Sequence, residues 1–237
     1  MSLLINTKQR TDAIEIMDDF SINGKILHRT LDTLANINKW LGGNKVTLNG
    51  LKKVLKYHPK KEPLTIIDLG CGSGDMLRKV ASFGKKGGYT FRLIGIDANK
   101  DAMVYARQLS KNYPEISFTD CDVFSEEFES LTYDVVLSTL FLHHFDENQI
   151  INLLSSLKKR AKLGIVVNDL HRHPMAYYLF KMVCLTIKNK MIIEDGLTSI
   201  LRGFKRKDLE KFSKTLQVIP QIKWKWAFRF QWIIQKQ

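Results

Sequence analysis

The stretch Ile67-Asp68-Leu69-Gly70-Cys71-Gly72-Ser73-Gly74-Asp75 decides the fold class. It closes an apolar run over Leu64–Leu69 and opens a helical stretch over Asp75–Phe83, so it reads as a glycine-rich turn between a strand and a helix. Glycine lets the backbone turn sharply and approach a ligand without a Cβ in the way. The N-terminus of the following helix presents free N–H groups and a partial positive charge, which favour a carboxylate or a phosphate. Such turns are common, so the glycines alone are a weak signal.

Short apolar runs alternate with helical stretches downstream of this turn. The next predicted strands are Arg92–Asp97, Ile116–Asp120, Tyr133–Thr139 and Leu163–Asp169, and the next predicted helices are Lys100–Asn112 and Glu147–Arg160. Strands that are apolar on both faces and joined by helices predict an α/β fold with a doubly wound, mostly parallel sheet. Ligands bind such sheets beyond the carboxyl ends of the strands, where the strand order reverses.

The first sixty residues read as helix. In Gly24–Leu41 the apolar residues recur at three- and four-residue spacing, which predicts an amphipathic helix. Gly42-Gly43 is predicted to end this helix with a residue in the left-handed conformation. Thr47 is a candidate N-cap for a second helix, which Pro59 ends.

The chain after the fifth predicted strand is harder to interpret. Pro174–Lys188 reads as a helix, a connection follows through Gly196 and Gly203, and Lys207–Leu216 reads as a further helix. The domain division that we predict is an N-terminal helical cap over residues 1–60 and a main domain over residues 61–237, with a helical insertion at about 171–203.

The tail has an unusual alternation of aromatic residues with basic or small ones. Trp224, Trp226, Phe228, Phe230 and Trp232 recur at every second position, which predicts one strand with an aromatic face and a basic face. Interleaved aromatic and basic side chains could stack on nucleic acid bases. In the alternative interpretation, the aromatic residues pack under a helix and the cations lie across the outer edge.

Composition excludes several classes of protein. The 237 residues hold 37 Lys and Arg against 24 Asp and Glu, a net charge of +13, and 44% of them are hydrophobic, which is typical of a globular protein. The basic residues are spread in pairs, which favours a solvated face over a nucleic acid partner. The three cysteines are too few and too scattered for a disulfide framework or a zinc site, and they favour a cytoplasmic location. No run reaches the roughly 18 apolar residues of a membrane span, and MSLLINTKQR lacks a signal-peptide core.

Three acidic residues follow one another at the ends of consecutive predicted strands. Asp68 lies inside the first strand, Asp97 ends the second, and Asp122 follows the third. A carboxylate so close to the glycine turn suits a ligand with a cationic amine or a sulfonium better than a pyrophosphate. Asp97 is placed to bind both hydroxyls of a ribose, and an acid of Asp120-Cys121-Asp122-Val123 can accept from an adenine amino group.

Together these motifs resemble the class I S-adenosylmethionine-dependent methyltransferases. The resemblance covers roughly residues 60–170. Within the family, the sequence most resembles the bacterial small-molecule group of ubiquinone/menaquinone-type and polyketide- or phenol-modifying enzymes. It rests on Ile67–Asp75, Gly95–Asp97, Cys121–Val123, Tyr133–Ser138 and Leu142–Phe145. Met17–Asp19, Asn38–Gly43 and Asn168–Pro174 point the same way.

The resemblance implies a Rossmann-like sheet of seven strands, with the last strand antiparallel near Trp224–Ile234, and S-adenosyl-L-methionine as the cofactor. Asp68 and the glycine turn would hold the methionine part, and Asp97 the ribose. Asp122 and Val123 would clamp the adenine. The full set of cofactor-binding residues that it implies is Asp68, Gly70, Cys71, Gly72, Gly74, Asp97, Ala98, Asp122, Val123, Ser138 and Thr139.

Four histidines lie just beyond strand ends, at the edge where the reaction is expected. His143 and His144 follow the fourth predicted strand, and His171 and His173 follow the fifth. Imidazole titrates near neutrality and can take a proton from a phenol or an enol. We predict His171, His143 and His144 as candidate catalytic residues, with His171 preferred; a structural histidine bonded to the backbone is the alternative for each.

The substrate side is predicted from the residues that follow the fifth strand. Arg172 could pair with an anionic group of the substrate, and Tyr177 and Tyr178 belong to a Met- and aromatic-rich stretch that suits a greasy aromatic ligand. No metal site is predicted. Asn168-Asp169 resembles half of the magnesium site of catechol-type O-methyltransferases, but Ser138 stands where the first acid should be, and hard cations need several oxygens.

The predicted function is the transfer of a methyl group from S-adenosylmethionine to a hydrophobic small-molecule acceptor, on a phenol or quinol oxygen or on carbon. The expected partner is a small aromatic molecule, with nucleic acid disfavoured, peripheral membrane contact open and oligomeric state unknown. The alternatives are an RNA or protein methyltransferase that uses the basic surface, and a non-catalytic module that binds S-adenosylmethionine.

Overall fold

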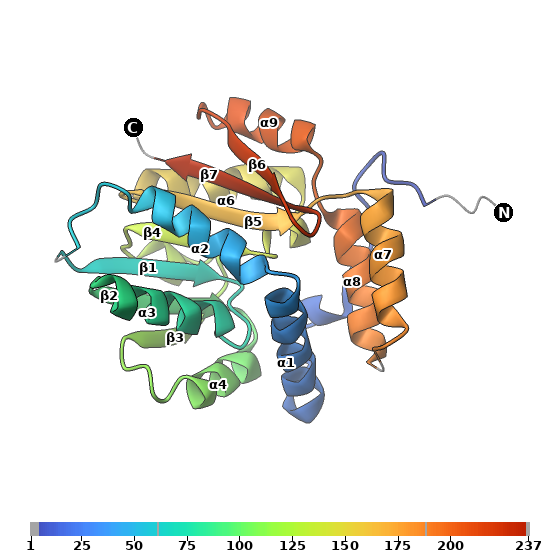
Figure 1. Cartoon of the computed structure of the whole chain (residues 1–237), viewed down its shortest axis with the longest axis horizontal. Helices are drawn as coiled ribbons and strands as arrows, with labels where there is room; N and C mark the ends of the chain where they lie inside the picture. The colour runs from blue at the N-terminus through green and yellow to red at the C-terminus, as the bar shows by residue number, and fades with distance from the viewer. Residues whose placement is uncertain (1–4, 61, 188, 236–237) are drawn as a thin grey trace.

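A seven-stranded sheet organises the molecule. The structure is a computed structural model that describes residues 5–60, 62–187 and 189–235. The strand order is β3-β2-β1-β4-β5-β7-β6, with β1 to β5 parallel and β7 antiparallel to both of its neighbours (Figure 1). The strands are β1 (Leu64–Leu69), β2 (Phe91–Asp97), β3 (Ile116–Asp120), β4 (Val135–Thr139), β5 (Gly164–Leu170), β6 (Gln221–Lys225) and β7 (Arg229–Gln235). The predicted doubly wound, mostly parallel sheet is confirmed.

Helices cover both faces of the sheet (Figure 1). One face packs under α2, α3 and α4, and the other packs under α6 and α9. The helices are α1 (Gly24–Trp40), α2 (Gly43–Val54), α3 (Asp75–Gly87), α4 (Lys100–Leu109), α5 (Glu126–Glu129), α6 (Glu147–Arg160), α7 (Pro174–Cys184), α8 (Lys190–Arg202) and α9 (Arg206–Thr215), with 3-10 turns η1 (Ile16–Asp18) and η2 (Leu142–His144). None of the described helices is long and apolar enough to cross a membrane.

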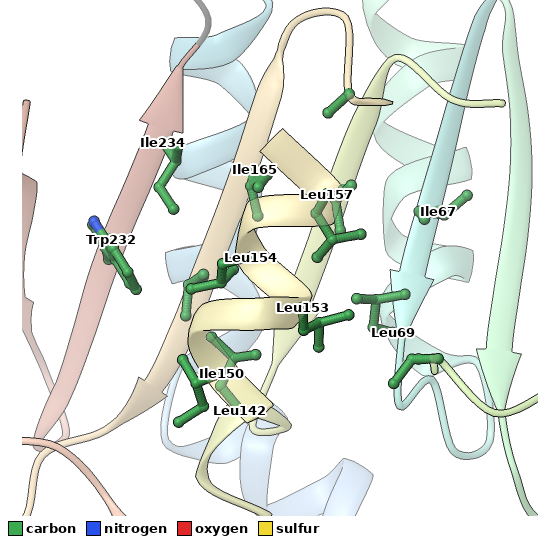
Figure 2. Close-up of a cluster of buried hydrophobic side chains, with 14 of the residues drawn as sticks. Ile67, Leu69, Leu142, Ile150, Leu153, Leu154, Leu157, Ile165, Trp232 and Ile234 are labelled. Atoms are coloured by element: carbon green, nitrogen blue, oxygen red, sulfur yellow. The ribbon is translucent and has the colours of Figure 1, made fainter. Parts of the chain in front are cut away.

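The core explains why the strands are apolar on both faces. On the α6 side, Leu153, Leu154 and Leu157 of the helix pack against strand residues such as Ile67 and Ile165 (Figure 2). The parallel strands run in the same direction, so their carboxyl ends meet at one edge, toward α1 and α7 (Figure 1). Functional side chains are therefore expected at that edge.

The first sixty residues are less helical than predicted. Apart from η1, the described residues before α1 run as an irregular segment, which covers the carboxyl edge of the sheet. Gly42 takes the predicted left-handed conformation, with φ of 74°, but it is the N-cap of α2. Thr47 is therefore inside α2 and is no cap: its hydroxyl lies 2.9 Å from the Thr139 hydroxyl.

The connection predicted through Gly196 is in fact the helix α8. Position 196 lies inside this helix, and it needs a glycine because α7 packs closely against it. A Cβ at this position would come within 2.4 Å of the Phe180 ring. From the sequence alone, this glycine indicated a connection between helices. In the structure it allows two helices to pack closely. Gly203, by contrast, is the C-cap of α8.

The tail forms a hairpin and not one strand. β6 and β7 pair antiparallel, with Trp224 opposite Phe230, so the alternation of the sequence is divided by a turn. Phe230 and Trp232 are buried among α9 residues, while Trp224 and Trp226 are exposed. The predicted single aromatic face is therefore wrong, because the period-two pattern continues through the turn without marking it.

We expect Leu154→Ala to lower the free energy of unfolding by about 2–5 kcal/mol, since it leaves a cavity in the fully buried core beneath α6. Leu185→Ala is the matched control, because Leu185 is largely exposed and its loss should change stability by about 0.5 kcal/mol or less. Urea denaturation followed by circular dichroism measures both. Equal losses in the two variants would contradict this assignment of the core.

Candidate functional site

A large cavity lies beyond the carboxyl ends of the parallel strands. Its volume is about 1040 Å³, and its walls come from the glycine turn, the irregular N-terminal segment, α1, α7, α8 and the tip of the β6–β7 hairpin. The apolar residues of the walls include Leu31, Leu34, Phe141, Phe180 and Ile200. The polar residues of the walls include Asp68, Asp97 and Thr139 at the strand ends, and Glu15, Asp195 and Arg202 from the N-terminal segment and α8.

The glycine turn forms one wall of the cavity. Gly70 and Gly72 line it with φ of 63° and 49°, in the left-handed region that glycine adopts freely. A Cβ at position 70 would also collide with the Phe141 ring at 2.2 Å. Gly74 is set apart from the other two: it is the N-cap of α3 and packs against Phe118 rather than lining the cavity.

Asp68 is a buried acid at the cavity wall. Among the described residues, nothing hydrogen-bonds its Oδ1 atom. Burial, with the nearby charges of Asp75 and Asp97, raises the pKa of this carboxyl well above its usual range. A ligand with a cationic amine would supply the missing donor and stabilise the carboxylate, so the residues present fit the amino end of S-adenosylmethionine.

Asp97 and the loop after β3 continue this polar edge. The Asp97 carboxylate accepts hydrogen bonds from the backbone N–H groups of Gly72 and Asn99, both at 3.0 Å. Burial raises the pKa of Asp97 despite these bonds. Ala98, Cys71, Asp122 and Val123 also line the cavity, and Asp122 Oδ1 accepts from the Phe124 N–H at 2.9 Å.

The two polar residues at the end of β4 differ in position. Thr139 lines the cavity, and its hydroxyl contacts that of Thr47. Ser138 is fully buried behind the wall, and its hydroxyl has no hydrogen-bond partner within the part of the chain that the structure describes. The structure therefore brings Thr139, but not Ser138, to the cavity.

His143 and Asp169 form a buried pair at the opposite side of the same edge. His143 Nδ1 lies 2.7 Å from Asp169 Oδ1, and the His143 backbone N–H donates to Oδ2 at 3.3 Å. Burial alone would raise the pKa of Asp169, but the charge and hydrogen bond of His143 lower it. An ionised Asp169 holds the proton on Nδ1, so Nε2, which lies 3.6 Å from Glu15 Oε1, is the nitrogen of this cavity-lining side chain that remains to act on a ligand.

Glu15 is a site residue that sequence reasoning missed. It comes from the irregular N-terminal segment, and its Oε1 lies 3.6 Å from His143 Nε2, while Oε2 accepts from the Ser199 hydroxyl at 2.7 Å. Burial raises the pKa of Glu15 to about 7. Glu15 lies 128 positions before His143, in a segment without hydrophobic periodicity. The sequence around it therefore does not indicate a role in the site, and only the folded chain shows one.

His144 is held on the same segment. Its Nδ1 lies 2.7 Å from Asp18 Oδ1, and Arg202 donates to the other oxygen of Asp18 at 2.8 Å. Glu15, His143 and His144 could together offer ligand atoms to a cation, since these atoms lie within 4.8 Å of one another. The positive charge of Arg202 stands 3.9 Å from Glu15 Oε1, however, and disfavours a cation at that oxygen. The arrangement therefore favours proton transfer over metal binding.

Comparison with known proteins identifies the family and the fold. Residues 60–231 match the family described as "Methyltransferase domain", which is most of the chain. The chain belongs to this methyltransferase domain family. The predicted resemblance to methyltransferases is confirmed.

Individual relatives are more distant. The methyltransferase is 27% identical over 154 residues, 62% of its own length and 64% of the relative's, to the 2-phytyl-1,4-naphtoquinone methyltransferase of Nostoc punctiforme. It is 36% identical over 83 residues, 34% of its length and 28% of the relative's, to a Bacillus subtilis protein that carries the name 23S rRNA (guanine-N(1)-)-methyltransferase YxjB. The matched part thus spans less than two thirds of each relative.

A solved structure shares the whole architecture. The plantazolicin methyltransferase BpumL in complex with SAH superposes with a TM-score of 0.66 at 17% identity, covering 88% of this chain and 90% of that one. At this identity the likeness establishes the fold.

His171, the base preferred from the sequence, is poorly suited to that role in the methyltransferase. It lines the cavity, but burial and the neighbouring His173, Lys205 and Arg172 lower its pKa to about 4. Its Nδ1 also lies within hydrogen-bond distance of Trp224 Nε1, at 3.2 Å. A histidine with so low a pKa holds a proton weakly at neutral pH, so His143 takes its place as the preferred candidate.

Arg172 does not face the cavity. Its buried guanidinium donates to the backbone oxygens of Thr7 and Gly203 and pairs with Asp208 at 3.0 Å, so it joins the N-terminal segment to α9. Tyr177 and Tyr178 likewise lie off the cavity wall. The residues of α7 that line the cavity are Ala176, Leu179, Phe180, Met182 and Val183.

Arg229 is a buried cation that does line the cavity. Its Nε and Nη1 atoms have no hydrogen-bond partner among the described residues, and burial lowers its pKa to about 10. Sequence reasoning placed it on a solvated basic face, because the hairpin turn before it was not recognised. Unpaired N–H groups on a buried cation fit an anionic oxygen of a ligand.

We expect Asp97→Asn to weaken the binding of S-adenosylhomocysteine by roughly tenfold to a hundredfold, since a carboxylate accepts from ribose hydroxyls more strongly than an amide does. Isothermal titration calorimetry measures the change. Asp120→Asn is the control, because Asp120 is an exposed acid at the end of β3 that contacts Arg107 at 3.8 Å. Unchanged affinity in the Asp97 variant would remove this residue from the cofactor site.

Proposed function

We propose that the methyltransferase methylates a hydroxyl oxygen of a hydrophobic aromatic small molecule, a phenol or a quinol. The observation that carries the proposal is the buried His143–Asp169 pair beside an apolar cavity. Such a pair can remove a hydroxyl proton, and the cavity is large enough for an extended ring system. The naphtoquinone methyltransferase relative acts on a related class of compound, as its name states.

The cofactor is proposed to lie along the polar edge of the cavity. Asp68 would bind its amino group, the backbone at Gly70 and Gly72 would pass beneath its methionine part, Asp97 would hold the ribose, and Val123 would contact the adenine. S-adenosylmethionine supplies a methyl group that its sulfonium already activates for displacement. The protein therefore has to align the acceptor oxygen with that methyl and to remove one proton.

In the proposed reaction His143 Nε2 takes the proton of the acceptor hydroxyl while the oxygen forms its bond to the methyl carbon and the bond from carbon to sulfur breaks. Asp169 stabilises the imidazolium that results, and Glu15 Oε1, 3.6 Å from Nε2, is placed to receive the proton. Arg229 would stabilise negative charge on the acceptor oxygen. The alternative of methylation on carbon uses the same residues, with the phenolate delocalised into its ring.

The remaining expectations also enter as proposals. We propose that residues 1–60 and the insertion at about 171–203 act together as the acceptor-binding part of the domain, since both line the cavity. A cytoplasmic location is proposed because Cys71, Cys121 and Cys184 are all free thiols, which a reducing compartment favours.

We expect radiolabel from S-adenosylmethionine to enter hydrophobic phenols and quinols, and His143→Gln to lower kcat by about a hundredfold or more while S-adenosylhomocysteine still binds. His171→Gln is the matched control on the same cavity and should retain activity within about threefold. A panel of alkylated phenols and quinols that yields no methylated product would overturn the acceptor class. Equal kcat losses in both histidine variants would overturn the role of His143.

We expect the rate of the wild-type protein to rise as the pH passes through about 7, because Glu15 loses its proton there and only its anion can receive the proton that His143 takes from the acceptor. The groups that face Glu15 are His143, His144, Asp18 and Arg202. Glu15→Gln should remove this inflection from the pH profile of kcat. Ser199→Ala, which removes only the hydrogen bond to Oε2, should keep an inflection; its loss in both variants would indicate a structural role for Glu15.

A further inference from the structure

The excess of positive over negative charge in the chain comes from three stretches of its sequence. Residues 33–61, 170–193 and 211–237 together hold seventeen Lys and Arg and no Asp or Glu, whereas the rest of the chain holds twenty Lys and Arg and twenty-four Asp and Glu. Within the described residues, these stretches contain the C-terminal part of α1 with α2, all of α7 with the first turn of α8, and the end of α9 with the β6–β7 hairpin. In Figure 1 the end of α1, the start of α2, α7 and the turn between β6 and β7 lie at the edge of the sheet where the parallel strands end.

Lysines of these stretches gather on the outside of the hairpin. Lys53 of α2 donates to Gln231 at 2.6 Å, and partial burial, with the charges of Lys223 and Lys225, lowers its pKa. Lys39 and Lys181 are exposed beside Trp40 and Met182 in the sequence. Because these stretches contribute many cations and no acid, they attract a partner of negative charge.

The mouth of the cavity is ringed by exposed apolar side chains. Trp40, at the end of α1, is 74% exposed, and Trp226, at the hairpin tip, is 67% exposed, yet both line the cavity. Met182 of α7 is 57% exposed and lines it too. Further exposed apolar residues of the lining are Ile14, Phe20, Phe124 and Leu179. Large apolar side chains gathered around one opening mark an interaction site.

We propose that this apolar rim and the lysines around it dock the methyltransferase on a bilayer that contains anionic lipids, with the cavity opening toward the acyl chains. Tryptophan favours the interface between headgroups and acyl chains, and lysine favours anionic headgroups. Aliphatic side chains such as Met182 and the neighbouring Leu185 gain by leaving water for the acyl region, whereas nucleic acid offers them little apolar surface. A lipid surface therefore fits the rim better than RNA does.

The test is vesicle flotation of the full chain. Vesicles of phosphatidylcholine are compared with vesicles that also contain about 30% phosphatidylglycerol, at about 0.1 M and about 0.5 M salt. We expect flotation with the anionic vesicles, with a smaller bound fraction at the higher salt. The double variant Trp40→Ala/Trp226→Ala should lower the vesicle affinity by at least about tenfold, and so should Lys181→Glu/Lys223→Glu.

Matched controls separate docking from unfolding. Tyr57→Ala removes an aromatic residue that is 84% exposed but lies off the cavity, and Lys111→Glu reverses an exposed charge outside the three stretches; both should keep wild-type flotation. Every variant should still bind S-adenosylhomocysteine. No flotation with anionic vesicles, equal flotation of the tryptophan variant, or binding of tRNA without binding of vesicles would overturn the proposal. The readout needs no methyl acceptor, so its outcome is independent of the proposed acceptor class.

Discussion

The site depends on buried polar side chains that parallel strands deliver to one edge of the sheet. Because β1, β4 and β5 are covered on both faces, Asp68, Ser138 and Asn168 enter an interior where an unpaired polar group is costly. Asn168 is satisfied in part by donating to Gly43 O and to the Thr47 hydroxyl, which fixes α2 on the sheet. Asp68 Oδ1 keeps no partner among the described residues. The fold thus leaves polar capacity for a ligand at the place where its strand order reverses.

The sequence predicted this edge well because each strand there carries its own signal. The apolar runs and the Gly70 turn required little tertiary context, and Asp97 followed from its position at a strand end. The acceptor side was predicted poorly, because its residues acquire their roles from contacts distant in sequence. Arg172 and Arg229 show this: the first is committed to Thr7, Gly203 and Asp208, while the second faces the cavity only because the chain reverses before β7.

The N-terminal segment illustrates how much of the site has no local signal. Arg10 donates to the backbone oxygens of Arg202, His143 and Phe145, and Asp195 accepts from the N–H groups of Ile16 and Met17. These bonds hold an aperiodic segment against α8 and η2, and they place Glu15 beside His143. A segment that has little regular structure is therefore ordered by charged and polar contacts, and its acid is buried because those contacts leave it no route to solvent.

The two ends of the cavity impose different physical demands. Near the strand ends the imidazole of His143 needs low dielectric surroundings and fixed partners, because its proton transfers depend on Asp169 and Glu15 keeping their positions. At the mouth, Trp40 and Trp226 are exposed, and their apolar contacts with a ligand do not require exact side-chain positions. One cavity can combine both because the sheet and α8 position the first end, whereas the ends of α1 and the hairpin build the second. A hydrophobic acceptor that enters the cavity would therefore contact apolar side chains at the mouth before it reaches the polar side chains where the reaction occurs.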